Sequence, residues 1–461
     1  MIQFWDIIER AENGKSLDAN DWDRLVGKIA AEVVSKFDLK YDPDNPVPAD
    51  DALADRMYEA GIELFERLGI YCIDTGKVLQ FSRREILEAL ENAPDQVVYG
   101  TGENMVHIPH RTIEDPRDPI VNFSAVGTPV TEELFVPICQ SYAQEPMADT
   151  FSGPLITEFR GMGVSSGSPV EVEGGIWNVV KLREAARWAG RPQMPIHNFM
   201  SVAERTDATI AAARPELGAL PGDGLFVAAV AELKVDYERL KKVSFLRHSP
   251  YVIGGLYGPL MGGFGGGPAA TAALLVAHHC LGVMAFRAQR HNAFPVHIHH
   301  VCNTSREMLW LVSVTGQALA RNSHLVIFAN AFMAAGPCTE MIVRELSAHS
   351  LTSTVSGWHL NPCAVAKNRQ PLHCSAMEPR IHAEVGHVAA RAGLDRKEVN
   401  RIVKALLEKY EKDFAQAPIG KSFTECYDPV LVRPRDEYLE LWEKGKKELA
   451  ELGLDFDLIH Q

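Results

Sequence analysis

One histidine stands where a barrel enzyme would carry out its chemistry. His197 lies near the end of the apolar segment "AGRPQMPIHNFM" (189–200), after a helical run and a turn at "GRP". In a barrel of parallel strands, the active site is built at the carboxyl ends of the strands. An unperturbed imidazole has a pKa of about 6.5 and can give or take a proton near neutral pH. His197 is therefore a candidate acid or base.

A second group of histidines offers a different chemistry. In "PVHIHH" (295–300), a strand would place His297 and His299 on the same side. A catalytic zinc needs three protein ligands, and Cys302 or His197 would complete the set. Strand histidines can equally be hydrogen-bonded core residues, and no acidic residue is close in sequence. A metal site and a packed core both remain open for this segment.

The elements that must position these residues alternate along the chain. Short apolar segments predict strands at "DPIVNF", "MADTFSG", "QMPIHNFM", "SPYVIGGLYG", "FPVHIHHV" and "HLVIFAN". Helical stretches lie between and after them, including 223–243, "DGLFVAAVAELKVDYERLKKV". This alternation predicts a parallel sheet with crossover helices, and its length fits a (β/α)8 TIM barrel. A doubly wound open sheet is the alternative. We expect a helical extension over 1–100, the barrel over 101–395 and C-terminal helices over 396–461.

The composition excludes several classes of function. The 461 residues carry a net charge of −14 and no long run of Lys or Arg, which argues against a nucleic-acid partner. No apolar run is long and uninterrupted enough to predict a membrane span, and the N-terminus does not resemble a signal peptide. The eight cysteines form no CxxC pair. They predict reduced thiols and a cytoplasmic location.

Several longer motifs carry a resemblance to a known family. They are "LGIYCIDT", "GTGEN", "AGRP", "AELKVD", "PVHI", "NTSRE", "AGPCTEM" and "KYEKDFAQAPIGKSFTECYD", and they run from about residue 69 to the C-terminal region. In this order they resemble the monomethylamine:corrinoid methyltransferase family of methanogenic archaea. The resemblance implies a (β/α)8 barrel and a homo-oligomer. It also implies transfer of a methyl group to Co(I) of a corrinoid (cobalamin) carried by a separate partner protein, so no cofactor is expected to be bound permanently by this chain.

The same resemblance suggests site residues and a departure from the family. His197, just past "AGRP", takes the position that pyrrolysine occupies in the archaeal enzymes. The two glutamates that the family places around it fall on Phe226 and Leu256, and the family's glutamine falls on Asn330. An arginine that follows "PVHI" in the archaeal enzymes is His299 here. We therefore expect His197, Asn330 and His299 to be the catalytic residues.

The departure has a consequence for the substrate. Pyrrolysine supplies an electrophilic imine that activates methylamine, and histidine cannot form that adduct. We expect a donor that arrives activated, foremost a quaternary amine, held by apolar and aromatic residues; these are Phe226, Leu256, Phe332 and Trp358, with Phe328 nearby. The alternatives are a methyl ether protonated by His197, monomethylamine by another route, a metal-dependent enzyme, and a barrel that binds without catalysis.

Overall fold

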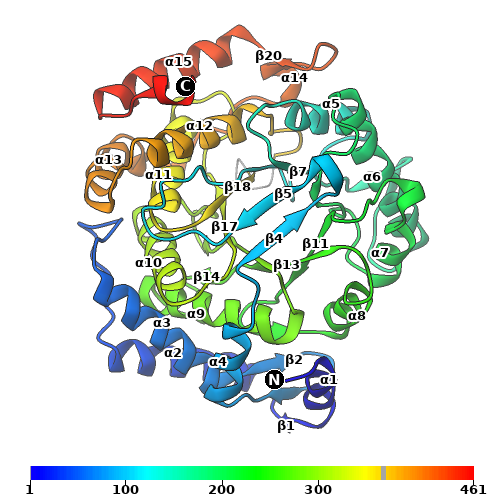
Figure 1. Cartoon of the computed structure of the whole chain (residues 1–461), viewed down its shortest axis with the longest axis vertical. Helices are drawn as coiled ribbons and strands as arrows, with labels where there is room; N and C mark the ends of the chain where they lie inside the picture. The colour runs from blue at the N-terminus through cyan, green and yellow to red at the C-terminus, as the bar shows by residue number, and fades with distance from the viewer. Residues whose placement is uncertain (1, 365–369, 461) are drawn as a thin grey trace.

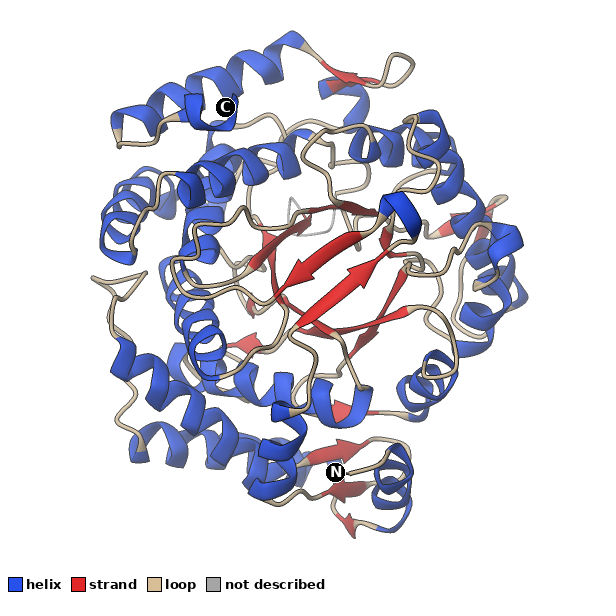
Figure 2. Ribbon diagram, in the orientation of Figure 1, coloured by secondary structure: helices blue, strands red, loops and turns tan. Residues whose placement is uncertain are grey.

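Eight parallel strands form a closed barrel at the centre of the molecule (Figures 1 and 2). The computed structural model describes residues 2–364 and 370–460. The barrel strands are β6 (Asn122–Phe123), β7 (Thr150–Ser152), β10 (Ile196–Asn198), β11 (Gly224–Ala228), β13 (Val252–Tyr257), β15 (Arg290–Ala293), β17 (Ile327–Phe332) and β18 (His359–Ala364). The (β/α)8 prediction is confirmed.

The strand pairing closes the barrel and excludes an open sheet. One run of parallel strands has the order β10-β7-β6, and the other has the order β11-β13-β15-β17-β18. A parallel bridge between Val121 and Leu360 joins β6 to β18. On the other side, the Phe199 amide donates to the Gly224 carbonyl at 3.0 Å, which joins β10 to β11.

A helix follows each barrel strand and covers the outside of the barrel. These helices are α5 (Glu132–Ala143), α6 (Pro169–Trp188), α7 (Thr206–Ala212), α8 (Tyr237–Leu246), α9 (Pro268–Leu281), α10 (Arg306–Asn322), α11 (Glu340–Val355) and α12 (Met377–Arg391). Local sequence fixes several starts: Ser168, Asp236 and Thr339 each accept a hydrogen bond from an amide in the first turn.

One stretch of the described chain, Pro268–Phe286, is apolar and long enough to cross a membrane, and 89% of its most apolar window is buried within the fold. It contacts both α3 (Asp51–Leu68) and α10. Its apolar character is explained by its position as a core helix, since a helix that is hydrophobic all round is a buried one.

A hairpin closes the amino-terminal end of the barrel. It consists of β4 (Gln96–Tyr99) and β5 (Val106–Pro109), which cross in front of the barrel in Figure 1. The hairpin's apolar side chains form a cluster with residues at the beginnings of β13 and β17; the cluster contains Val97, Tyr99, Ile108, Val252, Val326 and Phe328. The hairpin and this cluster therefore close the barrel interior at its amino-terminal end.

The N-terminal segment packs on one side of the barrel. Its helices are α1 (Phe4–Asn13), α2 (Ala19–Lys36), α3 and α4 (Arg83–Glu91). Three short strands form a sheet in the order β1 (Lys15–Ser16), β3 (Lys77–Leu79) and β2 (Ile70–Cys72). At its edge, β2 pairs with β12 (Lys234–Val235), which belongs to the loop after β11. This segment is thus tied to a loop at the carboxyl-terminal end of the barrel.

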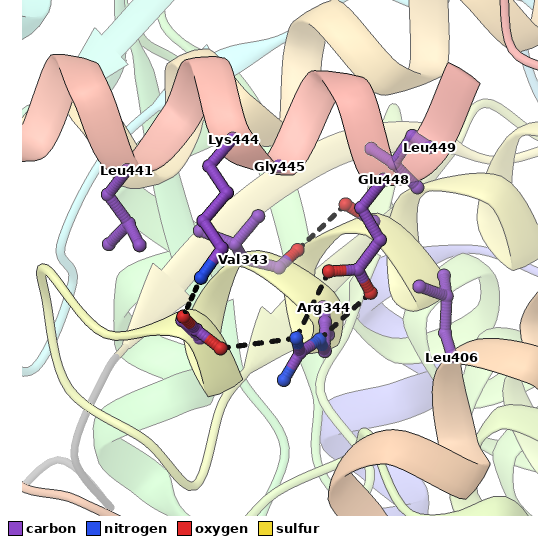
Figure 3. Close-up of a pocket in the computed structure, with 10 residues that line it drawn as sticks. Val343, Arg344, Leu406, Leu441, Lys444, Gly445, Glu448 and Leu449 are labelled. Carbon is purple, nitrogen blue, oxygen red and sulfur yellow. Dashed lines mark hydrogen bonds and ion pairs between the residues drawn. The ribbon is translucent and has the colours of Figure 1, made fainter. Parts of the chain in front are cut away.

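The C-terminal segment packs on the opposite side of the molecule (Figure 1). It contains α13 (Arg396–Tyr410), α14 (Phe423–Cys426), the strands β19 (Tyr427–Asp428) and β20 (Arg433–Pro434), and α15 (Asp436–Glu451). Figure 3 shows α15 held on α11 by Arg344, whose Nε and Nη2 donate to Glu448 at 3.0 Å each. Lys444 also pairs with Glu340. The cavity along this seam measures only about 10 Å³, so it is a packed interface.

The three-part division expected from the sequence stays a proposal. Its first boundary, at residue 100, falls between the two strands of the hairpin. Its second falls between α12 and α13, since α13 begins at Arg396.

Two local predictions were wrong. Most of "FPVHIHHV" is a loop: the barrel strand is Arg290–Ala293, just upstream, and only Val296–His297 forms a short strand (β16), which pairs with β14 (Leu260–Met261). The helix predicted over 223–243 begins only at Tyr237, because Gly224–Ala228 is strand β11. A short apolar run is compatible with a strand or with a buried helix, and periodicity does not separate them.

Candidate active site

A belt of hydrogen-bonded amide side chains crosses the barrel interior. Asn330 Oδ1 accepts from Asn292 Nδ2 at 3.0 Å and from Asn361 Nδ2 at 2.8 Å. Asn361 Oδ1 in turn accepts from Asn122 Nδ2 at 2.8 Å. The four side chains come from β15, β17, β18 and β6, and all are buried. Asn330 and Asn361 are register partners, whereas Asn292 pairs in register with Phe328, two residues before Asn330. The hydrogen bonds between the side chains therefore connect the four strands across this stagger.

His197 joins this belt at its edge. Its Nδ1 lies 3.3 Å from Thr150 Oγ1, and that hydroxyl donates to Asn122 Oδ1 at 3.1 Å. The imidazole ring stacks on Tyr99 with a centroid distance of 5.2 Å and meets the ring of Phe328 edge-on at 4.9 Å. The side chain is fully buried. His197 therefore fills the centre of the barrel, between the hairpin and the amide belt.

The packing keeps His197 neutral. Burial is the main cause that lowers the pKa of His197 well below its ordinary value, and the charge of Arg290 acts in the same direction. A hydrogen bond to Asn292 opposes the shift without reversing it. The residue is consequently an uncharged imidazole near neutral pH. It does not hold the proton that an imidazolium acid would have to donate to a methyl ether.

Arg290 is a buried cation whose hydrogen bonds go to uncharged groups. Its guanidinium donates to Tyr99 Oη, to Asn292 Oδ1 and to the carbonyl oxygen of His197, the last at 2.6 Å. It lies 4.2 Å from the centroid of the Phe226 ring, as a cation–π contact. Within residues 2–364 and 370–460, no acidic side chain forms an ion pair with it. The barrel interior thus carries an uncompensated positive charge beneath the amide belt.

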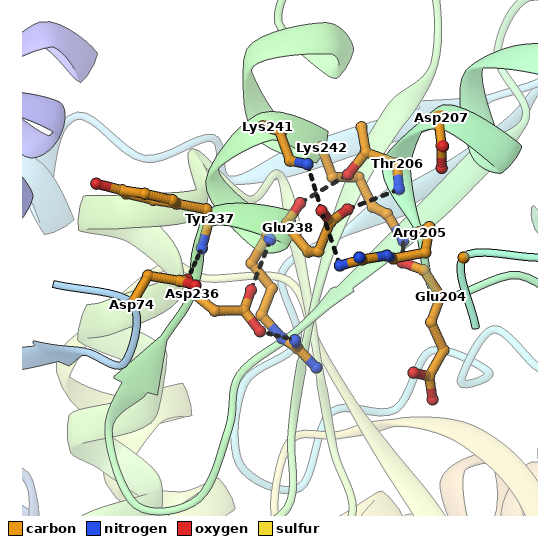
Figure 4. Close-up of polar contacts among 12 residues, drawn as sticks. Asp74, Glu204, Arg205, Thr206, Asp207, Asp236, Tyr237, Glu238, Lys241 and Lys242 are labelled. Atoms are coloured by element: carbon orange, nitrogen blue, oxygen red, sulfur yellow. Dashed lines mark hydrogen bonds and ion pairs between the residues drawn. The ribbon is translucent and has the colours of Figure 1, made fainter. Parts of the chain in front are cut away.

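Carboxylates hold the loops at the carboxyl-terminal end of the barrel. Figure 4 shows Glu238, in the first turn of α8, accepting from the Thr206 amide at 2.9 Å and from Arg205 at 3.2 Å. Burial alone would raise the pKa of Glu238, but the hydrogen bonds from Lys241 and Thr206 lower it to about 2. Glu171 of α6 accepts from the Glu204 amide at 2.7 Å. These contacts fix the loop that follows β10.

The structure places three of the expected substrate-binding residues in the barrel. Phe226 on β11 meets the His197 ring edge-on, with centroids 5.7 Å apart. Leu256 on β13 pairs in register with Asn292 and is half-buried. Phe332 ends β17, and its ring stacks on Phe294 at 5.8 Å, two residues beyond Asn330. These side chains form an apolar wall of the barrel interior, in which Phe226 lies beside Arg290 and His197.

Trp358 lies elsewhere, and its assignment to the substrate site was wrong. It precedes β18, at the amino-terminal end of the barrel. Its indole Nε1 donates to the Val312 carbonyl of α10 at 3.0 Å, and its ring lies 6.0 Å from that of His279 on α9. The side chain is fully buried between the barrel wall and the helices. It packs the outside of the barrel.

His299 is exposed, whereas the other two expected catalytic residues are buried in the barrel interior. The chain leaves β16 at His297, and His299 is exposed in the turn that follows. His297 Nδ1 accepts from the backbone amides of His299 and His300 at 3.0 and 3.2 Å. The two histidines therefore do not share a strand face as expected. Among the residues that the structure describes, no three His, Cys, Asp or Glu side chains converge on a metal position, and the metal alternative has no support there.

Sequence reasoning missed most of the belt. Asn122, Asn292 and Asn361 were not singled out, nor was Arg290. A signal was present, because each of these strands carries an asparagine inside a short apolar run: "VNF", "RHNA", "FANAF" and "HLNP". A buried polar side chain must find a partner, so repeated amides on neighbouring barrel strands indicate a network.

Comparisons with known proteins decide the family. A family model described as "Monomethylamine methyltransferase MtmB" matches residues 2–454. This chain belongs to the MtmB family. Monomethylamine methyltransferase MtmB of Methanosarcina mazei is 32% identical over 457 residues, which cover 98% of each chain. MtmB2 of Methanosarcina barkeri shows the same identity and coverage.

Solved structures agree with this assignment. The crystal structure of the Methanosarcina barkeri monomethylamine methyltransferase MtmB is 31% identical, covers 98% of both chains and superposes with a TM-score of 0.94. The hydroxylamine MtmB complex gives the same score. As a member of the MtmB family, the chain is a methyltransferase.

Proposed function

We propose that this protein transfers a methyl group from a small donor to Co(I) of a corrinoid carried by a partner protein. The single observation that carries the proposal is membership of the MtmB family across 2–454. The corrinoid belongs to the partner, and we assign no residue of this chain to hold it. The contribution of the barrel is to bind the donor and to orient its methyl group toward cobalt, since orientation removes much of the entropic cost of a two-molecule reaction.

We also propose that His197 replaces pyrrolysine, so that free monomethylamine is not the donor. Transfer of the methyl group from monomethylamine would leave an amide anion or an amine that departs poorly, unless the amine is first activated. The buried imidazole offers no electrophile for that activation. The donor must therefore be one that releases its methyl group without an imine.

Two donor classes satisfy this condition. A quaternary amine, the donor expected from the sequence, releases a neutral amine and needs no proton. A methyl ether releases an oxygen, and the neutral state of His197 argues against protonation of that oxygen by an imidazolium. An ether would therefore need another group to stabilise the departing oxygen. Both classes are compatible with the wall formed by Phe226, Leu256 and Phe332.

The test is methylation of free Co(I)-cobalamin by the purified protein. Quaternary amines, sulfonium compounds, methyl ethers and monomethylamine are supplied one at a time, and formation of methylcobalamin is followed by its absorbance. The proposal expects transfer from at least one donor other than monomethylamine. Transfer from monomethylamine alone, or from no donor at all, would contradict it.

We propose in addition that the protein is a homo-oligomer in the cytoplasm. The seven cysteines whose side chains the structure describes are free thiols, which suits a reducing compartment. Light scattering of the purified protein tests the oligomer, and a mass equal to that of a single 50.9 kDa chain would contradict it.

A further inference from the structure

The oxygen and nitrogen of each amide in the belt face in fixed directions, and Arg290 determines these orientations. A guanidinium has only donors, so the atom of Asn292 that faces Arg290 must be its carbonyl oxygen. The amide nitrogen of Asn292 then faces the next residue and donates to Asn330 Oδ1. The orientation of both amides therefore follows from the chemistry of Arg290, although the oxygen and nitrogen of an amide look alike in most structures.

The second arm of the belt converges on the same atom. Asn122 and Ser124 both donate to Asn361 Oδ1, at 2.8 and 3.0 Å. The amide nitrogen of Asn361 consequently faces Asn330 and donates to its Oδ1. A rotation of the Asn330 amide by half a turn would set its N–H groups against those of Asn292 and Asn361. The arm that begins at Arg290 thus fixes the orientation of Asn330, and the hydrogen bonds of the second arm fit the same orientation.

This arrangement leaves the nitrogen of Asn330 available. Its Oδ1 accepts two hydrogen bonds, whereas no acceptor for its Nδ2 is present in residues 2–364 and 370–460. Asn330 lies on β17, two residues before the half-buried Phe332 at the carboxyl end of the strand. The nitrogen is not among the enclosed polar atoms that lack a partner in the described residues, so it stays open to a bound molecule, whose oxygen would accept hydrogen bonds from its N–H groups.

We propose that Asn330 presents its amide N–H groups to the methyl donor, with Arg290 as the positioning residue, and that the donor is an O-methyl compound without net positive charge. This inference rests on the proposed function and specifies its substrate class. An ether oxygen has lone pairs that accept a hydrogen bond. A quaternary ammonium has neither a lone pair nor an N–H group, so it gains nothing from Asn330.

The positive charge of Arg290 in the barrel interior also favours an O-methyl donor over a cationic one. In the transfer step, Co(I) attacks the methyl carbon, a cobalt–carbon bond forms, and the carbon–oxygen bond breaks. The electron pair of that bond stays on the oxygen, which departs as an alkoxide or phenolate and takes a proton from solvent after release. Amide donors and a buried cation stabilise such an anion. The same cation repels a donor that is itself positively charged, because a buried charge is weakly screened.

The first experiment compares donors on the unaltered protein. Free Co(I)-cobalamin is supplied with ortho-methoxyphenol, para-methoxybenzoate, tetramethylammonium or monomethylamine. We expect methylcobalamin from at least one methoxy compound and none from tetramethylammonium. Transfer from tetramethylammonium but from neither methoxy compound would overturn this inference and leave the proposed function standing. Transfer from monomethylamine alone, or from no donor, would overturn both.

The second experiment replaces the N–H donors of Asn330 by a hydrogen-bond acceptor. Asn330→Asp keeps the size of the side chain but replaces the N–H groups by an acceptor, and we expect the methoxy transfer rate to fall roughly 10²–10³-fold. Asn20→Asp, the same exchange at an exposed helical position, should leave the rate unchanged. A rate in Asn330→Asp equal to that of the unaltered protein would overturn the role of Asn330.

The third experiment separates the positioning role of Arg290 from a merely structural one. Arg290→Met frees the Asn292 amide to rotate and removes the buried cation, so methoxy transfer should fall and tetramethylammonium transfer should become detectable. Arg290→Lys keeps a donor-only cation, so it should restore part of the methoxy transfer and suppress transfer from tetramethylammonium. If Arg290→Met does not fold, thermal unfolding of the unaltered protein gives the readout: para-methoxybenzoate should raise the melting temperature and tetramethylammonium should not. The reverse order would overturn the inference.

Discussion

At the scale of single residues, the decisive feature is that His197 is an uncharged ring in a closed aromatic environment. Tyr99 stacks on it and Phe328 contacts it edge-on. Because burial lowers its pKa well below the ordinary value, the imidazole does not titrate near neutral pH. We expect the transfer rate to show no histidine-dependent change between about pH 6 and 8.

This prediction is tested with the variant His197→Gln, whose initial rates of methyl transfer are measured across the same pH range. The profile of the variant should be parallel to that of the unaltered protein, and its rate should fall by much less than the ~10²–10⁴-fold typical of a lost proton donor. A decline in rate above about pH 6.5 that disappears in the variant would show that His197 donates a proton.

Part of this site could be predicted from the sequence. His197 was located by its place near the end of an apolar segment, and Asn330 by the resemblance to the monomethylamine methyltransferase family; both lie in the barrel interior. Arg290 was not, because a charged residue beside an apolar run is typical of a strand end exposed to solvent. Only the fold shows that Gly254 on the neighbouring strand leaves room for its guanidinium.

At the scale of elements, this space between β13 and β15 gives a stability prediction. A Cβ atom on Gly254 would lie 2.4 Å from the Arg290 guanidinium carbon, which is too close. Gly254→Ala must displace a buried, fully bonded side chain, and we expect a loss of about 1–3 kcal/mol in the free energy of unfolding. Gly163→Ala is the matched control, because a Cβ there meets no atom within 4 Å. Urea unfolding measures both, and equal stabilities would contradict the packing described for Arg290.

The arrangement of neighbouring strands also explains why one barrel strand was not predicted from the sequence. Strand β18, "HLNPCA", was not predicted, because Asn361 and Pro362 interrupt its apolar pattern. Asn361 is tolerated there because two donors reach its carbonyl oxygen and its own amide reaches Asn330. The register of neighbouring strands supplies these partners, and no local pattern in the sequence reveals that register.

At the scale of the whole molecule, many histidines are buried and neutral. Burial lowers the pKa of residues that include His278, His279, His291, His349, His359 and His382. For His279 the pKa falls to about 3, and the ring is fully buried on α9. An unfolded chain takes up a proton at such a residue below about pH 6.5, whereas the folded chain does not. The stability is therefore full above that pH and falls as the solution is acidified.

Buried acids change stability with pH in the opposite direction; the pKa of Glu378, for example, is raised to about 7. A substitution at one buried histidine therefore isolates the contribution of that histidine. Between pH 6.5 and 5, His279 should account for up to about 2 kcal/mol of lost stability. We expect His279→Gln to lose less stability over this range than the unaltered protein does. His248→Gln, an exposed histidine, should behave like the unaltered protein. Urea unfolding at several pH values measures the difference, and identical slopes for His279→Gln and the unaltered protein would contradict the account.

The most direct test of the central claim follows a labelled methyl group. The protein is mixed with Co(I)-cobalamin and with donors that carry a ¹³C methyl group, and the methyl–cobalt carbon is observed by NMR. A corrinoid methyltransferase whose histidine has replaced the activating imine should transfer label from an O-methyl or quaternary donor and none from free monomethylamine. Label transferred from monomethylamine alone would contradict it, since this would require an activation that His197 cannot provide.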